Sequence, residues 1–98
     1  MVINPKPTVE RARRESRRIM QRLETIIDEA LKKGLGEQIT PHPKITVSLQ
    51  YRDHEAYYRL RKFNLWGELL EKYKKVGWTV IESDYQKSAF LDFSYQQP

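Results

Sequence analysis

The spacing of apolar residues changes along the chain, and this change most strongly constrains the fold. Between residues 19 and 31 apolar side chains recur every three or four positions, as on one face of an α-helix. In KITVSLQY, residues 44–51, they alternate with polar residues, as in a strand with one buried face. Helical spacing returns over 53–76, and two short strands follow around a turn near 85–88. The sequence therefore predicts an α+β fold with the order α-β-α-β-β.

The boundaries of the first helix follow from local signals. MVINPKP, residues 1–7, carries two prolines and no periodic pattern, so a flexible lead is expected there. Thr8 is the expected N-cap and Gly34 the expected end, which places the helix over 8–33. Residues 8–98 are then one domain.

The remaining elements complete a single small sheet. One second helix is favoured over about 53–76, from an Asp53 cap to Gly77, with a kink as the alternative because Asn64 and Gly67 weaken its middle. The strand at 89–95 is the most apolar, and we expect it in the middle of a three-stranded sheet that packs against both helices.

Charge is distributed unevenly along the chain. The formal net charge is +5, and residues 1–23 alone account for it because they hold seven cationic and two acidic side chains. The rest of the chain is balanced. An asymmetry of this kind points to nucleic acid, an acidic protein or an anionic membrane as partner. The basic half of the first helix lacks the broad apolar face that a membrane surface requires, so no membrane partner is expected.

The basic half of the first helix is arginine-rich at a cost to its own stability. Like charges four residues apart, such as Arg14 and Arg18, disfavour the helix by about 0.2–0.5 kcal/mol per pair. Cations near a helix N-terminus also oppose its dipole. Arginine binds phosphate through two parallel hydrogen bonds. The predicted function is therefore non-enzymatic nucleic-acid binding, DNA slightly ahead of RNA, through six arginines: Arg11, Arg13, Arg14, Arg17, Arg18 and Arg22.

A second basic group extends the candidate interface onto the second helix. Basic side chains lie there next to Tyr57 and Tyr58, and aromatic and basic residues together can stack bases and hold phosphates. The alternative is that one of the two tyrosines is a half-buried core residue. The candidate residues of this group are Tyr58, Arg59, Arg61 and Lys62. A protein-interaction module that docks its basic helix on an acidic protein surface remains the alternative function.

Catalysis and cofactors are not expected. Glu82, Asp84 and Asp92 form the one acidic cluster, with Lys87 nearby, but they are explained as turn and edge-strand charges. The two histidines, His42 and His54, lie twelve residues apart without a third metal ligand.

Composition sets the cellular expectation. The chain has no cysteine, which excludes disulfides and thiolate zinc sites, and it has no apolar stretch of membrane-spanning length. A cytoplasmic protein is the expectation.

Apolar residues outside the faces expected to be buried suggest self-association. The hairpin has apolar side chains on both faces, and the second helix has an unusually wide apolar face. Clustered exposed apolar groups often meet a partner, and a twofold dimer is the commonest arrangement. A homodimer is therefore expected through Leu65, Leu69, Ile81 and Phe90.

Overall fold

The computed structural model describes residues 2–96, which form three helices and one antiparallel sheet. The helices are α1 (Lys6–Glu37), α2 (Arg52–Lys62) and α3 (Trp66–Lys75). The strands are β1 (Lys44–Gln50), β2 (Thr79–Tyr85) and β3 (Ser88–Ser94). The α+β class and the order of elements are confirmed, but the expected second helix is two helices.

The sheet has the order β1-β3-β2, so β3 lies in the middle as predicted. Alternate residues of β1 and β3 are buried, which places the helices on one face and leaves the other face open. In β2 the same alternation puts Val80, Glu82 and Asp84 on the helix-covered face, opposite Phe93, Leu91 and Ala89 of β3. The hairpin turns at Gln86, whose φ of 57° is left-handed.

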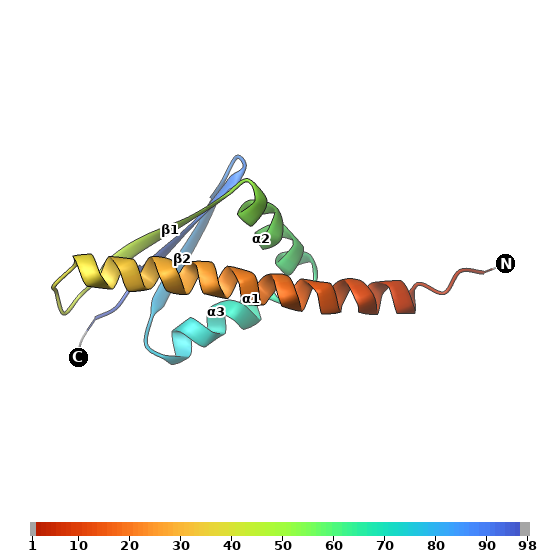
Figure 1. The fold of residues 1–98 in the computed structure, drawn as a ribbon, viewed down its shortest axis with the longest axis horizontal. Helices are drawn as coiled ribbons and strands as arrows, with labels where there is room; N and C mark the ends of the chain where they lie inside the picture. Colours follow the sequence, from red (N-terminus) through yellow and green to blue (C-terminus); the bar gives the residue numbers. More distant parts are fainter. Residues whose placement is uncertain (1, 97–98) are drawn as a thin grey trace.

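Helix α1 runs along the long axis of the molecule, and its N-terminal turns extend beyond α2 (Figure 1). Its start is two residues earlier than predicted because Pro7 lies in the first turn, where its missing N–H needs no partner. Asn4 Oδ1 accepts a hydrogen bond from the Lys6 amide at 3.0 Å. The segment before α1 is therefore shorter than the expected residues 1–7, and Thr8 is a helical residue rather than the N-cap.

Gly34 does not end α1, which continues through Gly36 to Glu37. A Cβ at Gly34 would lie 2.7 Å from Ile45 Cγ1, so the glycine lets β1 approach the helix closely. Gly34 was predicted to end the helix, but it is instead required inside the helix for close packing against β1.

The second helix breaks at Asn64, which adopts a φ of 58°. The Leu65 amide donates to Leu60 O at 2.8 Å and the Asn64 amide donates to Arg61 O at 3.2 Å. These two bonds form a Schellman motif, closed by the buried side chains of Leu60 and Leu65.

The same motif ends α3, where Gly77 has a φ of 106°. The Trp78 amide donates to Tyr73 O at 3.1 Å and the Gly77 amide donates to Lys74 O at 3.1 Å. The predicted end at Gly77 is therefore confirmed. Asn64 fills the equivalent place in the earlier motif, because asparagine tolerates the left-handed conformation better than most residues.

Candidate nucleic-acid interface

The six arginines of α1 divide into two sets. Arg13 and Arg17 face the corner between α2 and α3 and make contacts within the domain. Arg13 Nη1 donates to Phe63 O at 3.1 Å, and Arg17 Nη1 lies 3.3 Å from Glu68 Oε1. Both side chains are exposed, so the second contact is a solvent-screened ion pair. This set helps to hold α1 against the α2–α3 corner.

The other four arginines form a stripe on the outer side of α1. Arg14 and Arg18 lie two residues before and after the buried Ser16, which is about 200° around a helix of 3.6 residues per turn. All four are exposed, and within residues 2–96 none of them forms an ion pair. We call Arg11, Arg14, Arg18 and Arg22 the arginine stripe.

The stripe is less well compensated than the sequence suggests. Glu15 follows Arg11 by four residues, a spacing at which opposite charges on a helix can pair. In the structure the Glu15 carboxylate instead lies 3.2 Å from Arg59 Nη2 of α2. No acidic side chain lies in the first turn of α1 either. The positive charge of the stripe is therefore presented to solvent.

Arg59 is an internal link between α2 and α1. Its Nε donates to Ser16 Oγ at 3.0 Å, and Ser16 Oγ donates in turn to Ala12 O at 2.7 Å. Ser16 is fully buried, so this chain satisfies its hydroxyl. The structure thus gives Arg59 a packing role, and 43 residues separate it from Ser16 in the sequence.

Arg61 and the two tyrosines of α2 have different environments. Tyr57 is buried and its hydroxyl accepts a hydrogen bond from Arg61 Nη1 at 3.0 Å, with the guanidinium 5.5 Å from the ring centre. Burial, together with the charge of Glu82, raises the pKa of Tyr57 above its ordinary value. Tyr58 is 47% exposed. Tyr57 is therefore the core tyrosine and Tyr58 the one that faces solvent.

An open hollow of about 650 Å³ lies beside Tyr58. It combines cationic and aromatic side chains from α2 with one lysine from the turn between β2 and β3. Its walls, which we call the α2 groove, are His54, Glu55, Tyr58, Arg59, Lys62, Phe63 and Lys87. The sequence alone indicated Tyr58, Arg59 and Lys62 of this set. It assigned Lys87 to a turn, and only the hairpin brings that lysine to α2.

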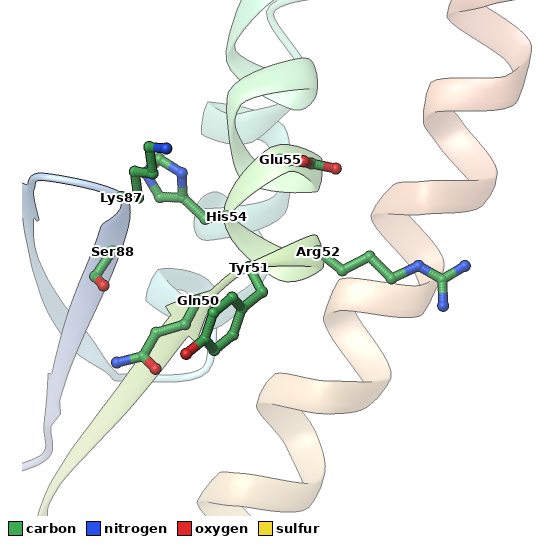
Figure 2. A pocket seen from close by; sticks show the side chains of 7 residues that line it. All are labelled: Gln50, Tyr51, Arg52, His54, Glu55, Lys87 and Ser88. Atoms are coloured by element: carbon green, nitrogen blue, oxygen red, sulfur yellow. The ribbon is translucent and has the colours of Figure 1, made fainter.

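A second hollow of about 540 Å³, shown in Figure 2, adjoins the α2 groove and shares His54, Glu55 and Lys87 with it. His54 is 6% exposed, and its Nε2 lies 3.2 Å from Asp84 Oδ1. In Figure 2 the Arg52 side chain extends away from Gln50 and Ser88, toward α1. Two cations line the second hollow: Arg52 is directed away from it, and Lys87 is shared with the α2 groove.

The acidic residues of the hairpin lie on opposite sheet faces. Glu82 and Asp84 face the helices, where Glu82 Oε2 accepts from Trp66 Nε1 at 2.7 Å. Asp92 lies on the open face and accepts from Thr46 Oγ1 at 2.7 Å. Among residues 2–96 no group of three or more potential metal-ligating side chains comes together. These carboxylates act as hydrogen-bond partners of tryptophan, histidine and threonine.

The residues proposed for self-association also divide. Leu65 and Leu69 are fully buried in the domain core, so their assignment to a dimer surface is corrected. Drawn as one continuous helix, residues 53–76 have an apolar face wider than one helix can bury. The structure has two helices instead, and α2 and α3 each direct their own apolar residues into the core. Ile81 is 62% exposed and Phe90 is partly exposed, both on the open sheet face.

Comparison with protein-family models, with curated proteins and with solved structures finds no match to this chain.

Within residues 2–96, no helix has both the length and the apolar character needed to cross a bilayer.

Proposed function

We propose that this protein binds nucleic acid through the arginine stripe of α1, without catalysing a reaction. The observation that supports this most directly is the division of the arginines. Arg13, Arg17 and Arg59 have partners inside the domain, whereas the four stripe residues have no ion-pair partner among residues 2–96. Four cations without an ion pair in the described part of the free protein, which also repel one another along their own helix, are accounted for by an external anion.

The stripe has dimensions that suit a phosphate backbone. Eleven residues separate Arg11 from Arg22, which is about 16 Å along an α-helix. That length covers about five base pairs of a duplex. Arginine also suits this task better than lysine, since its guanidinium makes two parallel hydrogen bonds to one phosphate. DNA is proposed slightly ahead of RNA as the polymer.

Salt dependence of binding tests the proposal. Four phosphate contacts predict a slope of about −4 in a plot of log affinity against log salt concentration for B-DNA. Replacing the four stripe arginines with glutamine should weaken binding by about 10³-fold at 0.1 M salt and flatten the slope toward zero. Fluorescence anisotropy with a labelled oligonucleotide measures both quantities.

The chain offers a control of equal charge. Lys44, Lys72, Lys74 and Lys75 are exposed and lie outside the stripe, on β1 and α3. Replacing these four lysines with glutamine removes the same charge and should change affinity by less than about fivefold, because long-range attraction between exposed charges is screened by salt. Equal losses in the two variants would show that only net charge matters. Absence of binding by the unmodified protein at low salt would leave the acidic-protein partner as the better explanation.

Homodimer formation stays a prediction, and the open face of the sheet is the surface proposed for it. Ile81 and Phe90 carry it, since Leu65 and Leu69 belong to the core. A second copy on this face would leave both arginine stripes free to act on one polymer. Light scattering at micromolar concentration should give twice the chain mass, and Ile81→Ser should return it to the monomer value.

A further inference from the structure

We propose that the α2 groove binds one unpaired nucleotide, with the base stacked on Tyr58 and a phosphate held by Lys62 and Lys87. This inference rests on the proposed nucleic-acid binding and names its ligand: a single strand, or an unpaired stretch next to a duplex. The arginine stripe then supplies the phosphate contacts and the α2 groove supplies the preference for unpaired bases.

Tyr58 is held as a stacking surface. The His54 ring lies 5.0 Å from the Tyr58 ring at an interplanar angle of 77°, and the Tyr57 ring lies 5.9 Å away at 70°. Both neighbours are buried, so they fix the Tyr58 ring from the protein side. Tyr58 as a whole is 47% exposed and lines the groove. A nucleobase can therefore stack on it without first paying to order the tyrosine.

The cations of the α2 groove are placed to hold a phosphate beside that ring. Lys62 follows Tyr58 by one helical turn, which puts both side chains on the same side of α2. Lys87 approaches from the β2–β3 turn. Neither lysine forms an ion pair within residues 2–96, and Glu55 is the one acidic residue in the wall. The wall is net positive, as a phosphodiester requires.

The volume and openness of the α2 groove fit a unit of a polymer. At about 650 Å³ it falls within the range of roughly 300–1,000 Å³ typical of small-ligand sites. It is an open hollow on the protein surface rather than an enclosed cavity. The backbone of a bound strand can therefore enter and leave on either side of the seated nucleotide.

The α2 groove adjoins the arginine stripe. Arg59 lines the groove, and its ion-pair partner Glu15 lines a shallow hollow together with Arg11, Arg14 and Arg18. One ion pair thus connects the two surfaces. A strand whose base occupies the groove can continue over this pair onto the stripe. The bases of a continuous duplex are stacked and paired in its interior, so only an unpaired base can reach Tyr58.

The test compares single-stranded and duplex DNA of equal length by fluorescence anisotropy. The unmodified protein should prefer a 16-nucleotide oligothymidine to the duplex. Tyr58→Ala should weaken single-strand binding roughly 10-fold, as expected for loss of one base–aromatic stack, and should leave duplex affinity within twofold. Tyr58→Phe should retain the preference because the ring is kept. Tyr85→Ala removes a more exposed tyrosine that lies outside the α2 groove, and it should change neither affinity.

A second variant keeps the test independent of the fold of α2. Lys87 lies in an exposed turn, so Lys87→Glu should fold normally and should still lower single-strand affinity more than duplex affinity. If the unmodified protein binds DNA but these variants leave its ratio of single-strand to duplex affinity unchanged, the groove proposal is overturned while the stripe proposal stands. If the unmodified protein binds neither form, both proposals fail.

Discussion

The two halves of α1 are held to the domain by different forces. The C-terminal half packs through Leu23, Ile27 and Leu31, which are all buried in the core. The N-terminal half has only Ser16 and Met20 buried, and polar contacts from Arg13 and Arg59 supplement them. Apolar burial stabilises one half, and hydrogen bonds to charged groups hold the other while leaving the arginine stripe free. The difference shows how one helix serves both as a core element and as a binding surface.

The largest expected effect comes from the apolar half. Ile27→Ala removes a fully buried side chain and should lower the free energy of unfolding by about 2–5 kcal/mol. Urea denaturation measures the change. Val9→Ala, in the exposed part of the other half, is the matched control and should change stability by less than about 0.5 kcal/mol. Similar losses from the two substitutions would contradict the division between the halves.

A glycine pair tests the close packing at the end of α1. Gly34→Ala should destabilise the fold by about 1–3 kcal/mol, because the new methyl group overlaps the stiff, buried Ile45 side chain. Gly36→Ala meets no atom within 4 Å and should stabilise the helix by about 0.5–1 kcal/mol. Thermal unfolding of the two variants should therefore shift in opposite directions. A shift in the same direction would remove the packing explanation for Gly34.

Alkaline pH should weaken the contact between α3 and the apolar half of α1. Tyr73 donates to Asp28 Oδ1 at 2.8 Å, and burial, that hydrogen bond and the charges of Asp28 and Glu24 raise the pKa of Tyr73 above 10.0. A raised pKa in the folded state means that the contribution to stability is complete below pH 10 and is lost as the pH rises further.

Tyr73→Phe isolates this effect. It should cost about 1 kcal/mol at pH 7 through the lost hydrogen bond, and it should reduce the fall in stability above pH 10. Tyr85→Phe, on an exposed tyrosine, is the control. An unchanged alkaline profile in Tyr73→Phe would show that Tyr73 does not couple stability to pH. The pKa of Tyr57 is also raised, so part of the alkaline dependence should remain in Tyr73→Phe.

The smallest expected effect concerns the arginine stripe, where substitution should raise rather than lower the free energy of unfolding. Replacing Arg14 and Arg18 with glutamine removes two like-charge pairs, Arg14–Arg18 and Arg18–Arg22, and one favourable pair between Arg14 and Glu10, so it should stabilise the free protein by about 0.2–0.5 kcal/mol at low salt. Arg13→Gln, by contrast, should be mildly destabilising because it loses the hydrogen bond to Phe63 O. Added salt should abolish the first effect, since it screens the repulsion. Destabilisation by the double substitution would mean that these arginines serve the fold.

Local patterns in the sequence determined the class of the fold, the strands and the order of elements. Alternation in KITVSLQY and helical spacing near Ile27 depend only on which side of each element is buried, so they can be read without knowledge of partners. The apolar character of residues 89–95 placed β3 in the middle of the sheet correctly, because a central strand faces neighbours on both edges. The concentration of arginine in residues 11–22 was equally visible.

Tertiary contacts decided which of those arginines remain free and where the second helix breaks. Arg59 meets Ser16, and Lys87 lines a groove with Tyr58, across separations that no local pattern encodes. Helix α2 ends before Asn64, whose backbone is left-handed. Burial of the next side chain, Leu65, in the core offsets the cost of that conformation. Periodicity sets which face of an element is apolar, but the partner of a polar side chain depends on distances that exist only after the chain has folded.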